Sequence, residues 1–474
     1  MIDLKDLRQN PDRYRQAAHD KAIRVDINAL LAFDEQLRQA MTRQQELAAE
    51  KNRIGKEIGR VAGQLKKADA DQRQALQTEM QTLQERPNQI KAEESEIDAK
   101  VASLESQRDA LLLKVPQPAA PHVPVAPDES GNVETSAWHP DWFDPRKTFA
   151  ENKGFEPKSH LELGRDLGLF DFERGVNIAG SRSYVLTGAG MLLHNAVLQA
   201  ALSFMSIDNG FTAMSVPVLV RDHVMTGTGF FPADKDQAYE IGESQRGGGY
   251  DLYLTGTGEV GLMAFHQNEI LPAESLPRRY VTLSTCFRRE AGSAGKDTAG
   301  LYRIHQFDKV EQVVLCEADL DISRQWHKKM IGYVETFMQR LELPYRLLQV
   351  CTGDMGPGKV DQIDVETWMP SRGPEDNHGK PLGAYGETHS ASQLGDYQTR
   401  RLNLRYRDPA DPKAKATRFC YSLNNTVCAS PRVLIPILEL YQNADGSVTV
   451  PAPLRPWLGG RETLTADQGL NLPA

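Results

Sequence analysis

Apolar residues recur at helical spacing through the first part of the chain. Between residues 27 and 115, glycine occurs only at Gly55, Gly59 and Gly63, and proline only at Pro87. Steps of four and three residues trace a seam made of Leu76, Met80, Leu83, Pro87, Ile90, Glu94, Ile97, Val101, Leu104, Arg108 and Leu111. A weaker repeat before it consists of Leu30, Leu37, Met41, Leu47, Ile54, Ile58 and Val61. Because heptad spacing is typical of coiled coils, we predict an antiparallel two-helix hairpin, with a turn near residues 66–72 and a kink at Pro87.

A proline-rich segment follows the predicted hairpin. Five prolines occur within thirteen residues, namely Pro116, Pro118, Pro121, Pro124 and Pro127. Such a composition is typical of an extended, semi-rigid linker. We therefore expect a helical arm over residues 1–115, a linker over 116–136 and a second domain over 137–474.

Short β-branched and aromatic runs replace the helical pattern after residue 137. The pattern predicts strands at 280–287, 309–317, 363–370 and 447–453, and helices at 190–210 and 324–341. Paired strands with few regular strand–helix–strand units favour a mixed, mainly antiparallel sheet flanked by helices. The whole chain is therefore predicted to be of the α+β class.

Composition and charge narrow the classes of protein that the chain can represent. The net charge is −9, whereas nucleic-acid-binding domains are usually basic, so any RNA contact must be local. The five cysteines lack CxxC spacing, which argues against a zinc site and against a disulfide framework. The first residues form no apolar signal segment, and no apolar run reaches about 18 residues. We expect a cytoplasmic protein without a membrane segment.

One stretch of the predicted hairpin is strongly basic. Residues 51–67 contain a single acid, Glu57, against Lys51, Arg53, Lys56, Arg60, Lys66 and Lys67. These cations lie near the predicted tip, where a stiff rod could bring them to a phosphate backbone. A solvated face of a dimerising coiled coil is the alternative interpretation.

A GxGxxG spacing occurs at residues 256–261, after the apparent strand DLYL. A dinucleotide fold would carry an acid about 20 residues further on, but residues 278–284 contain none. The loop instead offers Thr257 and Glu259, a hydroxyl and a carboxylate that could bind a small ammonium group. An ordinary polar loop is the alternative.

The densest group of functional side chains lies at residues 287–311. Arg288, Arg289 and Glu290 end one predicted strand. A loop of small residues leads to a second strand with Phe307, Lys309 and Glu311. Two arginines beside such a loop suit a polyphosphate, and an aromatic ring can stack on a base. Glu311 has apolar neighbours and would need a cationic partner if buried. A hairpin with surface charges is the alternative.

A third segment covers residues 422–442. We interpret its first part as a polar loop and its second, after Arg432, as an apolar helix. An arginine at a helix N-terminus strengthens the preference of that end for anions. A capped core helix is the alternative.

These three segments, in this order and after such an arm, resemble the motifs of class II aminoacyl-tRNA synthetases, specifically the bacterial-type seryl-tRNA synthetases. The resemblance covers nearly the whole chain, and FRREAGSAGKDTAGLYRIHQFDKVE (287–311) is its most specific part. It implies that L-serine is activated with ATP to seryl-adenylate and transferred to tRNA(Ser). It also implies Mg²⁺ but no zinc, and a homodimer with Pro217 at its interface.

The resemblance further implies roles for individual residues. Serine-binding residues would be Thr257, Gly258, Glu259, Arg288, Glu311, Asn424 and Thr426. ATP-binding residues would be Arg288, Arg289, Glu290, Ile304, Phe307, Glu387, Thr388, His389, Ser390 and Arg432. Magnesium would be held by Glu387 and Ser390, and catalysis would depend on Arg288, Glu290 and Arg432. The arm, with the six cations of residues 51–67, would bind tRNA from the partner subunit.

The chain departs from this family at several positions. The family usually carries Arg-Glu-Ile-Ser-Ser-Cys-Ser-Asn where residues 386–393 read GETHSASQ, so Gly386 lacks a charge and His389 is unexpected. Thr426 and Val427 replace serine and glycine, and one extra methyl group shifts selectivity by about 1–3 kcal/mol. Residues 371–383 resemble an inserted surface loop. A paralogue that loads another acceptor and a non-catalytic RNA-binding protein therefore remain alternatives.

Overall fold

The structure is a computed structural model that describes residues 1–242, 251–292, 300–407 and 416–466. The chain divides into two compact units. The first, here called the sheet unit, contains Met1–Ile2, Gln16–Ala22 and the residues from Pro116 onward. The second, the arm unit, contains Asp3–Arg15 and Ile23–Val115.

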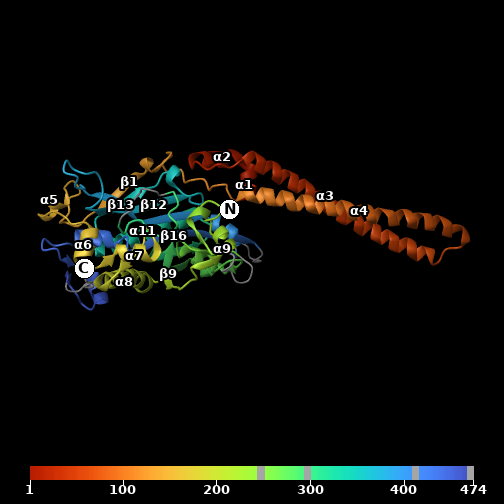
Figure 1. Ribbon diagram of the computed structural model, residues 1–474. Coiled ribbons are helices and arrows are strands. Elements are labelled where there is room, and N and C mark those ends of the chain that lie inside the picture. Colours follow the sequence, from red (N-terminus) through yellow and green to blue (C-terminus); the bar gives the residue numbers. More distant parts are fainter. Residues whose placement is uncertain (243–250, 293–299, 408–415, 467–474) are drawn as a thin grey trace. The chain divides into compact units, whose positions relative to one another are not determined.

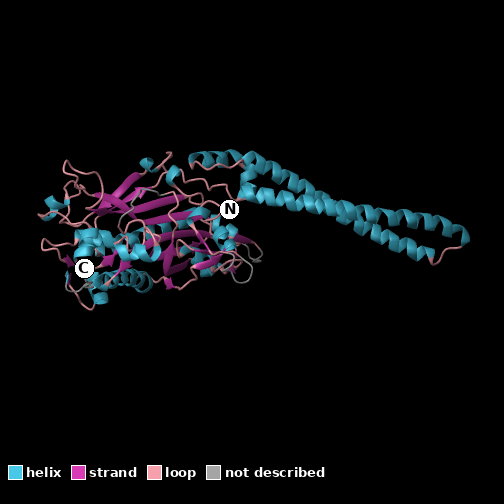
Figure 2. Cartoon of the chain, viewed as in Figure 1, coloured by secondary structure: helices cyan, strands magenta, loops and turns pink. Residues whose placement is uncertain are grey.

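Two long antiparallel helices make up most of the arm unit. They are α3 (Ile27–Leu65) and α4 (Ala70–Leu112), which run side by side in Figures 1 and 2 after the short helices α1 (Leu4–Gln9) and α2 (Pro11–Asp20). Asp26 and Asp69 cap the long helices, because their carboxylates accept hydrogen bonds from Ala29 N and Gln72 N. The four residues between Leu65 and Ala70 form the turn, which confirms the predicted hairpin.

The seam between the long helices follows the predicted repeat except at Met41 and at Leu111, where the neighbouring Leu112 is the buried residue. The buried residues of the seam are Leu30, Leu37, Ala40, Leu47, Ile54, Val61, Ile90, Leu104 and Leu112. The seam position predicted for Met41 is wrong, since its side chain is 44% exposed and Ala40 lies in the seam instead. A straight helix turns every 3.6 residues, so a strict heptad series drifts away from the contact line. Pro87 lies inside α4, which continues to Leu112.

An eight-stranded sheet forms the centre of the sheet unit. Its order is β1-β11-β12-β13-β16-β10-β9-β4, and among its described strands only β4 and β9 pair in parallel. The bounds are β1 (Val133–Trp138), β4 (Thr212–Ala213), β9 (Arg278–Phe287), β10 (Gln306–Cys316), β11 (Tyr345–Gln349), β12 (Asp361–Met369), β13 (Ala384–Gly395) and β16 (Tyr421–Ser430). The predicted mixed, mainly antiparallel sheet is confirmed.

Apolar helices cover one face of this sheet. They are α8 (Gly188–Ser203), α11 (Leu320–Arg340) and α13 (Leu434–Leu440), and their buried side chains share one core cluster with Val310, Val314, Val365 and Val427 of the strands. By length and composition alone, Gly188–Asp208 could cross a membrane, but half of that window is buried inside the protein. Leu193 and Val197 of this stretch belong to the core.

The remaining elements are short and surround the sheet (Figure 2). The helices are α5 (Phe149–Lys153), α6 (His160–Asp166), α7 (Phe172–Ala179), α9 (Asp222–Gly227), α10 (Glu259–Ala264) and α12 (Tyr397–Arg401). The strands are β2 (Phe170–Asp171), β3 (Val185–Leu186), β5 (Leu219–Arg221), β6 (Tyr239–Glu240), β7 (Leu252–Leu254), β8 (Ile270–Leu271), β14 (Arg405–Arg407), β15 (Thr417–Phe419), β17 (Val448–Thr449) and β18 (Thr463–Leu464). The predicted strand at 447–453 is therefore much shorter than expected.

One local prediction is wrong at the centre of the sheet. The segment before Arg432 was interpreted as a polar loop, but it is the central strand β16. Asn425 of this strand is buried, and its Nδ2 donates to Met330 O at 3.0 Å, while its Oδ1 has no hydrogen-bond partner among the described residues. Buried polar groups with hydrogen-bond partners do not prevent a strand from forming at the core.

Candidate active site

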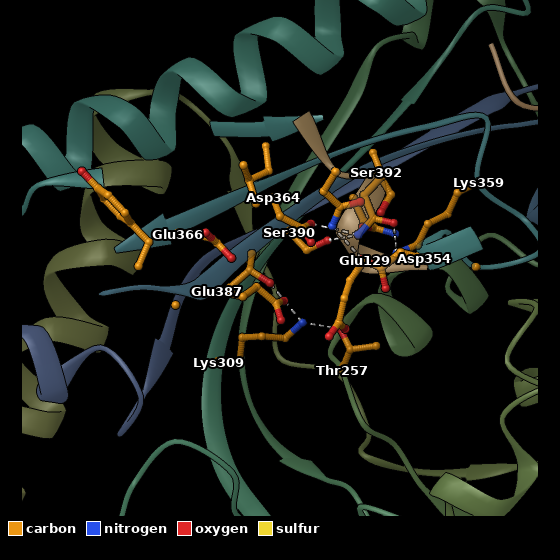
Figure 3. A pocket seen from close by; sticks show the side chains of 18 of the residues that line it. Glu129, Thr257, Lys309, Asp354, Lys359, Asp364, Glu366, Glu387, Ser390 and Ser392 are labelled. Carbon is orange, nitrogen blue, oxygen red and sulfur yellow. Dashed lines mark hydrogen bonds between the residues drawn. The ribbon is translucent and has the colours of Figure 1, made fainter. Parts of the chain in front are cut away.

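A large cavity, of about 1170 Å³, lies on the sheet face opposite the apolar helices (Figure 3). Alternate residues of four adjacent strands line it, namely Lys309 and Glu311 on β10, Asn424 and Thr426 on β16, Ser390 and Ser392 on β13, and Gln362, Asp364 and Glu366 on β12. Side chains two residues apart on a strand share one face. The same strands therefore present polar residues to the cavity and valines to the core.

Lys309 and Glu311 form a buried ion pair at one end of the cavity. Lys309 Nζ lies 2.5 Å from Glu311 Oε2 and donates to Thr257 Oγ1 at 2.8 Å. Thr426 Oγ1 donates to the same Glu311 oxygen at 3.2 Å. Lys309 is thus the cationic partner that a buried Glu311 was predicted to need, because an unpaired buried carboxylate is costly.

Glu259 adds a second buried carboxylate to this cluster. It is the first residue of α10, and its Oε1 accepts a hydrogen bond from Gln398 Nε2 at 2.6 Å. Burial, and after it the like charge of Glu311, raises the pKa of the Glu259 carboxyl. The cluster thus holds two carboxyl groups against one ammonium, and a small cationic ligand would favour the ionised form of Glu259.

Close packing of the 256–261 loop places Thr257 and Glu259 beside β9. A Cβ atom added at Gly258 would lie 2.4 Å from Thr282 Cγ2 and 2.8 Å from Ser284 Oγ. Only glycine fits there, because real Cβ contacts are longer. The glycines of this loop serve close packing rather than nucleotide binding.

A smaller cavity of about 50 Å³ shares several lining residues with the large one. Its lining residues are Arg288, Glu290, Leu301, Tyr302, Ile304, Phe307, Lys309, Glu387, Thr388, His389, Thr426, Ala429, Ser430 and Arg432. This set contains nearly all of the residues expected to bind ATP. The exceptions are Ser390, which lines the large cavity only, and Arg289, which lines neither cavity.

Two arginines face this smaller cavity from different elements. The Arg288 guanidinium lies 5.3 Å from the centre of the Phe307 ring. Arg432 Nε donates to Tyr302 O at 3.0 Å and its Nη1 donates to Glu387 O at 2.9 Å. Arg288 follows β9 and Arg432 precedes α13, so the fold brings together side chains that are far apart in the sequence.

His389 and Glu290 both line this cavity, and their surroundings determine their charge. Burial, and then the charge of Arg432, lowers the pKa of His389 to about 3, so its ring is neutral. Glu290 pairs with Arg303 at 2.8 Å. His389 can therefore act as a neutral hydrogen-bonding group, and Glu290 is an acid that is paired with a cation.

Carboxylate and hydroxyl oxygens that could bind a metal ion line the cavity where magnesium was expected. Gln362 Nε2 donates to Asp364 Oδ1 at 2.9 Å and to Ser390 Oγ at 3.1 Å. Burial, and then the nearby charge of Glu387, raises the pKa of Asp364 to about 7. Within the described part of the chain, no three histidine, cysteine, aspartate or glutamate side chains are close enough to hold a metal ion. Carboxylate and hydroxyl oxygens still fit Mg²⁺, which takes few protein ligands and keeps phosphate and water oxygens.

The remaining predicted residues lie outside both cavities. All six basic residues of 51–67 are exposed. Four lie on α3, where Lys51 pairs with Glu94 at 2.6 Å and Arg60 with Glu79 at 2.8 Å, and Lys66 and Lys67 lie in the turn that follows. Pro217 is exposed on the sheet unit. The small residues 293–299 of the 287–311 segment lie outside the described residues.

Asp364 and Gln398 belong to the site but were missed in the sequence. Lys309 was noted on the strand with Phe307 and Glu311 but was given no role, although alternation along the strand places it on their face. Nothing in the sequence marks Asp364 or Gln398, since the acids that they lie beside in the site, Glu387 and Glu259, are 23 and 139 residues away in the chain.

The sheet, the two arginines and the acid cluster together define the core of a class II aminoacyl-tRNA synthetase. Residues 241–441 match the family model described as "tRNA synthetase class II core domain (G, H, P, S and T)", and residues 1–116 match "Seryl-tRNA synthetase N-terminal domain". The chain belongs to the seryl-tRNA synthetase family, whose members are also called serine–tRNA ligases.

Individual relatives support this assignment over the full length. A serine–tRNA ligase of Deinococcus radiodurans is 41% identical over 98% of this chain and 99% of its own, and one of Streptomyces coelicolor is 40% identical at the same coverage. Among solved structures, a seryl-tRNA synthetase of Pyrococcus horikoshii complexed with ATP superposes with a TM-score of 0.81 and 32% identity, covering 98% of this chain and 99% of that one. The cytoplasmic serine–tRNA ligase of Naegleria fowleri in complex with AMP has a TM-score of 0.76 and 27% identity, covering 96% of each chain.

Proposed function

We propose that this protein activates L-serine with ATP to form seryl-adenylate and then transfers the seryl group to tRNA(Ser). The observation that carries this proposal is the buried acid and hydroxyl cluster, which lies within the same pair of cavities as two arginines. A small amine with its own carboxylate fits between the two groups of opposite charge.

The amino-acid end of the cavity suits serine. Glu311, Glu259 and Thr257 offer acceptors for the α-ammonium and the side-chain hydroxyl, and Asn424 and Thr426 bound the same end of the cavity. Gly258 keeps the loop against β9. The buried acceptors favour a substrate with a hydroxyl donor, because an apolar analogue would leave them unpaired.

The nucleotide end suits ATP. Phe307 offers a ring for the adenine, and Ile304, Glu290, Thr388 and His389 line the same small cavity. Arg288 is placed to bind the α-phosphate and the serine carboxylate, and Arg432 to bind the γ-phosphate. A role for Arg289 stays a prediction that its position outside both cavities does not support.

The first chemical step needs no general base. The serine carboxylate is already ionised, so one of its oxygens attacks the α-phosphorus while the bond from that phosphorus to pyrophosphate breaks. Arg288 and Arg432 offset the negative charge that gathers on the phosphate oxygens, and positioning supplies much of the remaining rate. Glu387 and Ser390, with Asp364 beside them, would hold Mg²⁺, which neutralises phosphate charge when it is bound.

The second step transfers the seryl group. A hydroxyl of the terminal ribose of tRNA attacks the carbonyl carbon of seryl-adenylate, and AMP leaves. Binding of tRNA by the arm of the partner subunit, a homodimer with Pro217 at its interface, and a cytoplasmic location belong to the same proposal.

Serine-dependent exchange of pyrophosphate into ATP tests the first step, and charging of tRNA(Ser) tests the second. We expect exchange with serine above threonine, alanine, glycine and cysteine. Exchange with none of these amino acids would overturn the proposal. Exchange without charging would favour a paralogue that loads a different acceptor.

A further inference from the structure

The Tyr302 ring contacts two guanidinium groups at the nucleotide end of the site. The Arg372 guanidinium carbon lies 3.8 Å from the ring centre and that of Arg432 lies 4.3 Å from it. Both distances are within the range of cation–π contacts. Arg372 belongs to residues 371–383, which were interpreted as an inserted surface loop, yet it lines the large cavity together with Tyr302 and Glu387. This loop therefore adds a cation to the cavity.

Gly386 makes room for the Arg372 side chain. A Cβ atom added at this buried position would lie 3.1 Å from Arg372 Nε and 3.2 Å from both Arg372 Cδ and Tyr302 Cε2. The backbone of Gly386 does not have a positive φ, so its conformation does not call for glycine. Glycine is favoured at position 386 because a larger residue would crowd the side chains of Arg372 and Tyr302. Arg372 thus brings a cation to a place where the strand itself carries none.

The loop that carries Arg372 is anchored to the helix that follows Arg432. Ser371 N donates to Glu439 Oε2 at 3.0 Å and Ser371 Oγ donates to Glu439 Oε1 at 2.6 Å. Glu439 is fully buried on α13 and also accepts a hydrogen bond from His160 N at 2.9 Å. Both arginines therefore start from backbone positions that are held to the same helix.

We propose that Arg372 binds polyphosphate: its guanidinium, together with that of Arg432, contacts the β- and γ-phosphate oxygens of ATP and of the departing pyrophosphate. The inference rests on the proposed function and extends it by one residue. Two guanidinium groups on one ring repel each other less when an anion lies beside them. The fork of donors on each guanidinium matches phosphate oxygens in pairs.

Arg372→Ala tests the proposal in the exchange reaction. We expect the KM for ATP and for pyrophosphate to rise about 10-fold to 100-fold, the range expected for a lost hydrogen bond to a charged group, while the KM for serine stays within about twofold. AMP lacks the β- and γ-phosphates, so inhibition by AMP is expected to be unchanged. Equal losses of ATP and AMP affinity would instead indicate general damage to the site and overturn the proposal.

Two further variants separate charge from packing. Lys380→Ala removes an exposed cation of the same loop, paired with Glu156 at 3.3 Å, and is expected to leave all constants unchanged. Arg372→Ala combined with Gly386→Arg returns a guanidinium from the strand into the vacated space, and is expected to recover much of the ATP affinity. Loss in Lys380→Ala equal to that in Arg372→Ala, or no recovery in the double variant, would contradict a phosphate-binding role.

Direct binding distinguishes failure of this inference from failure of the proposed function. If the unaltered protein shows no amino-acid-dependent exchange, calorimetric titration of ATP and of AMP into the unaltered and Arg372→Ala proteins still tests Arg372. A weaker ATP affinity with unchanged AMP affinity supports the inference, and equal ATP affinity in both proteins overturns it.

Discussion

At the scale of single residues, the buried cluster of Lys309, Glu311 and Thr257 determines how the site can bind a substrate ammonium. Lys309 balances Glu311, and its ammonium contacts the same two side chains that would hold a substrate ammonium. Substrate binding must therefore rearrange these contacts, since two cations repel at such short distances.

Glu311→Gln should raise the KM for serine about 10-fold to 100-fold and change the KM for ATP little. The amide keeps a hydrogen-bond acceptor for Thr426 but loses the charge that binds the ammonium. Steady-state exchange kinetics check this. Glu366→Gln is the matched control, because Glu366 lines the same cavity but pairs with Arg346 at 2.6 Å. A larger effect on ATP than on serine would contradict the assignment.

His327 should make stability depend on pH. Its ring is buried on α11, its Nε2 donates to Ala391 O at 3.1 Å, and burial lowers its pKa despite Asp361, which lies 3.8 Å from Nδ1 and also contacts His122. Below the ordinary histidine pKa of about 6.5 the unfolded chain binds a proton that the folded protein does not. Stability is therefore present above this pH and is lost as the pH falls.

His327→Gln, which keeps a donor for Ala391 O, should reduce this acid sensitivity. The measurement is the free energy of unfolding in denaturant at pH 7.5 and pH 5.5. His378→Gln, at an exposed histidine, is the control and should keep the unaltered difference. If the free energy of unfolding of His327→Gln still differed between the two pH values as much as that of the unaltered protein, His327 would not be the source of the acid sensitivity.

At the scale of elements, α4 of the hairpin contains a proline, Pro87, which lowers the stability of the helix without ending it. Pro87 has no backbone donor for Leu83 O, and proline inside a helix costs up to about 3 kcal/mol relative to alanine. The seam leucines and isoleucines on both sides of this position hold the helix together by packing.

Pro87→Ala should slow hydrogen exchange of the amides at residues 88–91, because the substitution restores the missing hydrogen bond. Mass-spectrometric hydrogen exchange of the intact protein checks this. Ala92→Gly, at an exposed position of the same helix, should act in the opposite direction and cost about 1 kcal/mol. Unchanged exchange in Pro87→Ala would mean that the helix is limited by something other than this residue.

At the scale of the whole molecule, a net charge of −9 coexists with a basic stretch on the arm. Lys51 and Arg60 pair with acids of α4, whereas Arg53, Lys56, Lys66 and Lys67 make no ion pair with any described residue. The cations available for a phosphate backbone are therefore fewer than the sequence suggested.

Replacing Lys56, Lys66 and Lys67 with glutamate should raise the KM for tRNA about tenfold or more. It should also make the dependence of this KM on salt concentration shallower, because fewer counterions are released. Serine-dependent exchange should be unchanged, since it needs no tRNA. Lys100→Glu, an exposed substitution elsewhere on the hairpin, is the control. Charging by the triple variant at the unaltered KM would refute tRNA binding by these residues.

Local pattern alone determined the helical hairpin, the strands β9, β10 and β12, and the helices α8 and α11, since each has its own periodicity. The short motifs also marked Thr257, Glu259, Arg288, Glu311 and Arg432, because their polar or charged side chains stand out against glycine or apolar neighbours. Only the tertiary structure decided that β16 is a strand, that Lys309 and Glu311 are buried together, and that Arg372 reaches the site. Burial against elements that are distant in the chain determined these outcomes, and a pattern of neighbours along the chain does not contain that information.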